Sequence, residues 1–265
     1  MDTAAIKQRQ QEIWALGDYS YMSRVLRPAA VALCDACAVS AGQEVLDVAA
    51  GDGNFALACA REGARVVASD IAPAMVERGR ARSEAEGFPI EWVEADVEEL
   101  PFDDASFDCV GSVFGAMLAP RPEVAAGELF RVVRSGGTVG MTAWTPGSFA
   151  AELFAIGRRY MPSQPGQPLA EEWGDEGTVR ERFDGLASRV ELERHTLPLE
   201  AETPEEFVAE TRASAGSWEV ARRTLPPDRF DAMEREFVEL VRRRGGAGPV
   251  QIDNEYVVIV ARRRE

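Results

Sequence analysis

Short apolar segments alternate with helix-length segments between residues 44 and 144, and no other feature of the chain constrains the fold as much. The apolar segments predict five strands, which cover residues 44–50, 64–69, 90–95, 107–113 and 138–144. Helices are predicted at residues 54–62, 73–87 and 121–134. Strands separated by helices of about 10–15 residues are typical of a parallel sheet with helices on both faces. We therefore predict an α/β fold with a doubly wound sheet.

The first predicted strand leads into a glycine turn within residues 45–54, whose sequence is VLDVAAGDGN. Glycine has no Cβ, so Gly51 and Gly53 allow backbone N–H groups and the start of the next helix to approach a ligand closely. Asp47 and Asp52 add carboxylates beside this turn. Carboxylates suit a ligand with cationic or amine-bearing groups better than a pyrophosphate at the same place.

Asp70 ends the second predicted strand and follows the glycine turn at the distance expected of a ribose-binding acid, which is about 20 residues. The order glycine turn, helix, strand and acid predicts a cofactor that contains a nucleoside. Residues 51–56 also match the dinucleotide pattern G-x-G-x-x-A, so this motif alone leaves the cofactor open. Asp96 and the segment 112–117 map to the same sheet edge, where ligands of doubly wound folds bind.

The charge of the chain argues against nucleic acid as a partner. The formal net charge is −16, and Lys7 is the only lysine among 29 basic residues. A phosphate-tracking surface needs clustered positive charge, which this composition does not supply. Such acidity serves solubility and would not repel a cationic small molecule.

The four cysteines do not predict a metal site. Cys34 and Cys37 form one CxxC pair without a second pair or a nearby histidine, which disfavours zinc. We interpret the cysteines as small apolar residues of a reduced protein. Neither a signal peptide nor a membrane-spanning run is visible, so we expect a cytoplasmic protein without a membrane partner.

The remaining segments flank or interrupt the alternating pattern. Residues 1–43 predict a helical lid over the core at 44–145, and residues 146–187 predict a second lid inserted between the fifth and sixth strands. Residues 188–265 return to the core sheet with a strand, two helical segments at 204–224 and 227–244, and a final strand. We expect one domain overall.

Five motifs in this order resemble the class I S-adenosylmethionine-dependent methyltransferases, in the branch that acts on small molecules. They are VLDVAAGDGN at 45–54, VASDI at 67–71 with Pro73 and Met75, EADV at 94–97, LPF at 100–102 with SFD at 106–108, and ELFRVVRSGG at 128–137. The chain departs from the family pattern at Ala49, Asp52 and Ser135. The resemblance implies a Rossmann-like sheet of seven strands, mainly parallel, with an antiparallel last strand.

The resemblance also implies roles for the residues at the sheet edge. Asp47 and the backbone of Ala49, Ala50, Gly51 and Gly53 would hold the methionine end of S-adenosylmethionine. Asp70 would bind the ribose, Ile71 and Val97 would flank the adenine, and Asp96 would accept from the adenine amine. Ser112 and Phe114 would face the methionine end or the acceptor. Tyr19, Met75 and Met117 complete the expected cofactor contacts.

The expected reaction is an in-line methyl transfer that leaves S-adenosylhomocysteine, and the protein mainly has to align the two reactants. A base is needed only if the acceptor loses a proton. The candidates for that base are His195, Tyr21 and Tyr19. Aromatic residues of the lids and the sheet edge predict a pocket for a small, largely hydrophobic acceptor, lined by Tyr21, Phe114, Trp144, Phe149 and Trp173. We expect a monomer or a homodimer.

Two other functions stay open at this point. A nicotinamide-dependent oxidoreductase fits G-x-G-x-x-A and Asp70, but Asp47 lies where dinucleotide folds have apolar residues. A Tyr-x-x-x-Lys pair is also impossible, because Lys7 is the only lysine. The other alternative is a protein of the same fold that catalyses a non-methylating reaction or acts as a binding module.

Overall fold

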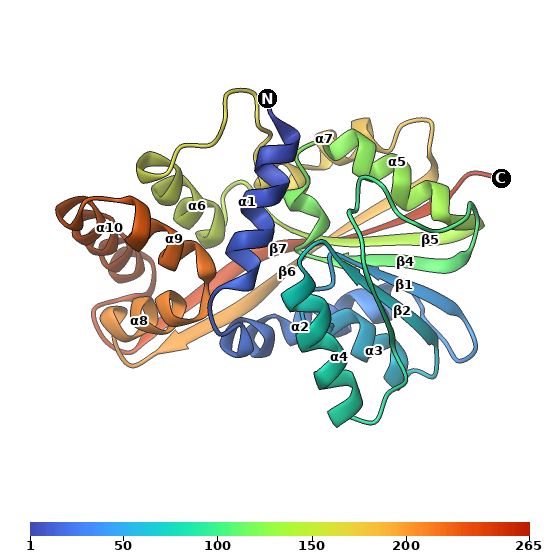
Figure 1. Ribbon diagram of the computed structural model, residues 1–265, viewed down its shortest axis with the longest axis horizontal. Helices are drawn as coiled ribbons and strands as arrows, with labels where there is room; N and C mark the ends of the chain where they lie inside the picture. Colours follow the sequence, from blue (N-terminus) through green and yellow to red (C-terminus); the bar gives the residue numbers. More distant parts are fainter.

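A single seven-stranded sheet organises the chain, with the strand order β3-β2-β1-β4-β5-β7-β6 (Figure 1). The computed structural model describes all residues, 1–265. The strands are β1 (Glu44–Val48), β2 (Arg65–Asp70), β3 (Glu91–Glu94), β4 (Phe107–Val113), β5 (Val133–Trp144), β6 (Ala187–Ala201) and β7 (Val250–Arg263). β1 to β5 pair in parallel, whereas β7 runs antiparallel between β5 and β6. The predicted fold class is therefore confirmed.

Helices cover both faces of the sheet, as the doubly wound pattern requires. Figure 1 shows α2, α3 and α4 on one side of the strands and α5 and α7 on the other. The helices are α1 (Thr3–Ala15), α2 (Ser20–Ala36), α3 (Asn54–Arg61), α4 (Pro73–Ala85), α5 (Pro122–Val132), α6 (Phe149–Tyr160), α7 (Glu176–Arg182), α8 (Pro204–Ser214), α9 (Gly216–Thr224) and α10 (Pro227–Gly245). Two short 3₁₀ helices, η1 (Ala116–Leu118) and η2 (Ala170–Gly174), complete the set. None of the helices has both the length and the apolar character that crossing a membrane requires.

The structure differs from the sequence prediction in the segment 204–224, where one helix was expected and two are found. Ala215 takes an extended conformation between α8 and α9. A Cβ on Gly216 would lie 2.0 Å from the carbonyl oxygen of Ile13. The end of α1 therefore packs against the backbone at this break, and a continuous helix could not make the contact.

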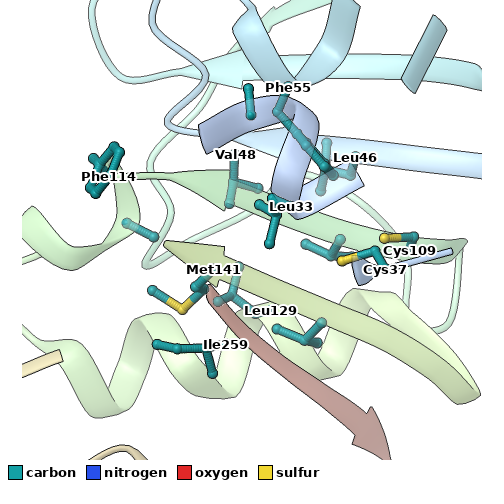
Figure 2. Close-up of a cluster of buried hydrophobic side chains, with 14 of the residues drawn as sticks. Leu33, Cys37, Leu46, Val48, Phe55, Cys109, Phe114, Leu129, Met141 and Ile259 are labelled. Carbon is teal, nitrogen blue, oxygen red and sulfur yellow. The ribbon is translucent and has the colours of Figure 1, made fainter. Parts of the chain in front are cut away.

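The chain has two hydrophobic clusters. The larger one lies between the sheet and its flanking helices, and Figure 2 shows its side chains from α2, β1, α3 and β4 meeting those from β5, α5 and β7. The smaller cluster joins α6, α8, α9 and α10 to the outer parts of β6 and β7, with Phe149, Trp218, Phe237 and Leu240 among its members. The segment 146–187 contributes to both, because α6 joins the smaller cluster while Trp173 of η2 joins the larger.

Trp92 supports the glycine turn from below. Its indole is 7% exposed, and its Nε1 donates a hydrogen bond of 3.1 Å to Ser83 Oγ. A Cβ on Gly79 of α4 would lie 2.0 Å from the ring, and a Cβ on Gly53 would lie 2.8 Å from it. The two glycines thus leave the space that the indole fills between α4 and the turn.

This packing predicts opposite effects for two helical glycines. Gly79→Ala should lower the free energy of unfolding by about 1–3 kcal/mol, because the new methyl group collides with Trp92. In Gly127→Ala of α5, the new methyl group meets no atom within 4 Å. This variant should raise the free energy of unfolding by about 0.5–1 kcal/mol, because alanine restricts the unfolded chain more than glycine does. Denaturant unfolding of both variants measures these changes. Equal effects at the two positions would contradict the packing of Trp92 described above.

Candidate functional site

The turn between β1 and α3 presents bare backbone at the carboxyl edge of the sheet. Ala49, Gly51 and Gly53 have φ angles of 49°, 57° and 90°, in the left-handed region that favours glycine. A Cβ on Gly51 would meet no atom within 4 Å, so this residue faces open space. The turn therefore leaves room for a ligand to approach its main chain.

Asp70, at the end of β2, holds this turn in place. Its Oδ2 accepts a hydrogen bond of 2.8 Å from the Gly51 N–H, and its Oδ1 accepts one of 2.9 Å from the Ala72 N–H. Burial raises the pKa of Asp70 to about 6, although these backbone N–H groups favour the charged form. Each carboxylate oxygen has a further lone pair, so the same side chain is able to accept from the hydroxyl groups of a ribose.

Asp47 places a second carboxylate under the turn. Its Oδ2 accepts a hydrogen bond of 2.9 Å from the Ala56 N–H in the first turn of α3, whereas its buried Oδ1 has no partner. Burial raises the pKa of Asp47 well above its usual range, and the charges of Asp70 and Asp52 act in the same direction. An unpaired buried carboxylate oxygen fits a ligand that donates through an amine or ammonium group.

Asp52 does not add free negative charge to the turn, contrary to the sequence-based expectation. Its carboxylate accepts from Ser23 Oγ at 2.9 Å and forms an ion pair of 3.0 Å with Arg82. Asn54 Nδ2 donates to the carbonyl oxygen of Ser23 at 2.8 Å. Asp52 and Asn54 thus clamp the turn to α2 and α4, a role that the motif did not reveal because their partners are remote in sequence.

Ser112 and Phe114 shape the site from the end of β4. Ser112 is fully buried, and its Oγ donates to the Val48 carbonyl at 2.8 Å and accepts from the Ala116 N–H at 2.9 Å. Its hydroxyl therefore ties β1 to the segment after β4. Phe114 has a φ of 57°, and its ring stacks on Trp144 with centroids 3.9 Å apart. Left-handed backbone at a bulky residue is strained, which is a common feature of functional sites.

The residues expected around adenine gather on the other side of the turn. Ile71 and Val97 are half-buried in the segments after β2 and β3. Asp96 accepts from the Glu98 N–H at 2.9 Å through Oδ1 and pairs with Lys7 at 2.5 Å through Oδ2. Two of the three further expected contacts, Met75 and Met117, are 2% and 4% exposed. The third, Tyr19, lies near Asp70: burial raises the pKa of its phenol, and the Asp70 carboxylate raises it further.

Two aromatic residues expected in an acceptor pocket lie in hydrophobic clusters instead. Phe149 is fully buried against Phe207, with ring centroids 5.7 Å apart. Trp173 is 1% exposed and packs against Phe183. Trp144 and Phe114 also belong to the larger cluster, but they stack on each other at the ends of β5 and β4, at the carboxyl edge of the sheet.

Two of the three candidate bases are phenols whose pKa values are raised, and the third lies away from the turn. Burial raises the pKa of Tyr19 to about 12, and its hydroxyl oxygen accepts from the Gly216 N–H at 3.2 Å. Burial and the nearby Glu210 raise the pKa of Tyr21. His195 lies in β6, four strand positions from β1 and thus about 19 Å away across the sheet. Both phenols therefore stay protonated near neutral pH. The histidine is distant from the turn, but its ring centroid lies 5.4 Å from that of Tyr256.

Lys7, Gln10 and Gln11 were not expected at the site. Gln10 Nε2 donates to the Leu118 carbonyl at 2.7 Å, and Gln11 Nε2 donates to the Ile71 carbonyl at 2.9 Å. The three side chains share one face of α1, because residues three and four positions apart are neighbours on a helix. The sequence indicated this polar face only through the spacing of these three residues and through the fact that one of them is the only lysine.

Comparison with known proteins agrees with this geometry. The sequence matches the family described as a methyltransferase domain over residues 46–141. It is 35% identical over 258 residues to an uncharacterised protein of Mycobacterium tuberculosis, covering 96% of this chain and 93% of that protein. It is 43% identical over 109 residues to the demethylmenaquinone methyltransferase of Clavibacter sepedonicus, covering 41% of this chain and 44% of the relative.

Solved structures show the same fold. The YcgJ protein of Bacillus subtilis superposes with a TM-score of 0.61 at 20% identity, over 89% of this chain and 99% of that one. The phosphoethanolamine N-methyltransferase 2 of Haemonchus contortus, solved with S-adenosyl-L-methionine, superposes with a TM-score of 0.57 at 17% identity, over 90% and 53% of the two chains. A glycine turn held by Asp70 on this fold, together with the matching family, leads to one conclusion: the chain belongs to the class I S-adenosylmethionine-dependent methyltransferases, whose cofactor is S-adenosylmethionine.

Proposed function

We propose that this protein transfers a methyl group from S-adenosylmethionine to a small, largely hydrophobic organic acceptor by in-line displacement. The observation that carries the proposal is the hydrogen bond between Asp70 and the Gly51 N–H. It places a buried carboxylate, which suits a ribose diol, beside a turn whose backbone is open to a ligand. When bound, S-adenosylmethionine supplies an electrophilic methyl group on a positively charged sulfur.

The chain's own residues then bind and orient the two reactants. Asp70 accepts from the ribose hydroxyls, and the free Oδ1 of Asp47 accepts from the amino group of the methionine end. Asp96 accepts from the adenine amine, and Ile71 and Val97 lie against the adenine ring. Alignment of donor and acceptor and the removal of water from between them supply most of the rate of such a displacement.

The acceptor meets the methionine end near Phe114 and Trp144. Both rings are 6% exposed and stack on each other at the end of β4 and β5, and Tyr256 packs on both from β7. An aromatic wall of this kind favours an acceptor with an apolar body. The similarity to a relative named demethylmenaquinone methyltransferase supports a small organic acceptor, and that compound is the first to test.

A second candidate function is a non-methylating reaction on the same fold. One structural neighbour is described as a [4+2]-cyclase and superposes with a TM-score of 0.55 at 16% identity. That likeness concerns the fold alone. The candidate bases favour neither function, because a base is needed only where the acceptor loses a proton.

The cofactor contacts predict how Asp70 controls affinity. Asp70→Asn should raise the Kd for S-adenosylhomocysteine about 100-fold, because hydrogen bonds from the ribose to a charged acceptor are lost. The affinity of the unmodified protein should fall as the pH drops below about 6, since binding requires the carboxylate and the folded pKa of Asp70 is about 6. Calorimetry between pH 5 and pH 8 measures both effects.

Asp253→Asn, at an exposed position of β7, is the matched control and should leave the affinity unchanged. Burial also raises the pKa of Asp47, so this carboxyl group contributes to the pH dependence of binding. The pH dependence that persists in Asp70→Asn measures the contribution of Asp47. Unchanged affinity in Asp70→Asn would remove the ribose assignment.

Methyl transfer predicts two products in equal amounts. With methyl-labelled S-adenosylmethionine and a panel that starts with demethylmenaquinone in its reduced quinol form, the protein should form S-adenosylhomocysteine together with an acceptor in which the labelled methyl group replaces one hydrogen, which leaves as a proton. Mass spectrometry measures both products. An acceptor that rearranges without gaining mass, while S-adenosylmethionine stays intact, would support the non-methylating function instead.

A further inference from the structure

Helix α1 crosses the mouth of the site. Gln10 bonds the Leu118 carbonyl after β4, Gln11 bonds the Ile71 carbonyl after β2, and Lys7 pairs with Asp96 after β3. β1 lies between β2 and β4 in the sheet, so a helix that joins the segments after these two strands passes over the end of β1 and its glycine turn. Figure 1 shows α1 between the fan of parallel strands and the group of α6, α8, α9 and α10.

Polar contacts hold α1 on this edge, with little apolar burial. Ile6 is the only buried residue of α1, whereas α2 buries five residues. Ser23 of α2 is also clamped to Asp52 and Arg82. Segments with few buried apolar contacts open at low free energy, while the rest of the fold stays intact. α1 is therefore able to lift from the site while α2 stays in place.

The turn between α1 and α2 provides the pivot. Gly17 has a φ of 82°, and a Cβ there would lie 2.6 Å from the Ser214 carbonyl oxygen. The Asp18 N–H donates to the Ala213 carbonyl at 3.3 Å, and Arg78 donates to the Gly17 carbonyl at 3.0 Å. These contacts fix the end of α1 at its turn, so motion of the helix must occur about this point.

Both ion pairs of α1 come from Lys7, which lies ten residues before Gly17. Its Nζ lies 2.5 Å from Asp96 Oδ2 and 2.5 Å from Glu98 Oε2, and its side chain is 16% exposed. The Glu98 side chain is fully buried and accepts from the Arg121 N–H at 2.6 Å and from Arg121 Nε at 2.7 Å. A buried carboxylate keeps Arg121 as a partner when Lys7 leaves, so release of Lys7 does not strand a charge.

We propose that α1 is a gate over the cofactor site and that Lys7 is its latch. The adenosyl cofactor enters and leaves when Lys7 releases Asp96 and Glu98, and α1 closes again over the bound cofactor. Asp96 is also the proposed acceptor for the adenine amine, so the latch closes on the carboxylate that holds the adenine. The inference rests on the proposed function, because it assumes that the site beneath α1 binds S-adenosylmethionine.

Exchange kinetics test the latch. Lys7→Gln should raise both the association and the dissociation rate of S-adenosylhomocysteine about tenfold, because a partly buried ion pair to two carboxylates no longer holds the gate. Stopped-flow fluorescence measures both rates. Lys7→Arg keeps the charge and can still pair with both carboxylates, so both rates should stay within about twofold of those of the unmodified protein.

The matched control is Arg9→Gln. Arg9 is exposed on the same helix, and removing it costs α1 the same single charge without breaking an ion pair. It should leave both rates unchanged. If Lys7→Gln exchanges the ligand as slowly as the unmodified protein, or if Arg9→Gln speeds exchange equally, the latch is refuted. Thermal unfolding of each variant verifies that the fold is retained.

Chemical labelling of Lys7 measures the opening of the gate in the unmodified protein. Lys7 is the only lysine, so acetylation by an N-hydroxysuccinimide ester modifies just Lys7 and the N-terminal amine of Met1, which is 53% exposed and serves as the internal reference. Saturating S-adenosylhomocysteine should slow acetylation of Lys7 about fivefold relative to that reference, because the ligand favours the closed gate. Peptide mass spectrometry measures the ratio.

Calorimetry on the unmodified protein separates the two ways in which this inference could fail. Absence of S-adenosylhomocysteine binding would overturn the proposed function and the gate together. Binding with an unchanged Lys7 acetylation ratio would overturn the gate and leave the proposed function standing.

Discussion

The site depends on one hydrogen bond, from the Gly51 N–H to the carboxylate of Asp70. It joins the end of β2 to the turn after β1, so the acid and the open backbone reach the sheet edge as one unit. Burial makes this carboxylate costly to ionise, which is why its pKa is raised to about 6. A ribose whose hydroxyls donate to the same oxygens would stabilise the charged carboxylate. That stabilisation, which the unbound protein lacks, would contribute to the affinity for the cofactor.

The surrounding structure keeps this unit in place. Trp92 fills the space under the turn, Ser112 ties β1 to the segment after β4, and Arg82 neutralises Asp52 from α4. Each contact comes from a rigid element and involves a buried or half-buried side chain, which gives the turn one conformation. Helix α1 is the exception, since its hold on the edge is polar, and motion at the site is therefore expected there.

Local patterns predicted the sheet and the position of the glycine turn and Asp70 at its edge. Apolar segments and helix lengths predicted β1 to β5 and the doubly wound order. The glycine turn and Asp70 were expected at one sheet edge, and the hydrogen bond from the Gly51 N–H to Asp70 joins them there. The binding of a nucleoside at this place stays a prediction. Long-range contacts were the features that could not be predicted. The break at Ala215 exists because Ile13 approaches Gly216. The burial of Phe149 and Trp173 escaped prediction because an aromatic residue suits a pocket and a core equally well.

The most direct test of this account is a crystal structure of the protein with S-adenosylhomocysteine. We predict that both ribose hydroxyls lie within hydrogen-bond distance of the Asp70 carboxylate, that the Gly51 N–H still donates to it, and that the adenine lies between Ile71 and Val97. A nucleoside bound elsewhere, or an Asp70 side chain turned away from the ribose, would contradict the central claim.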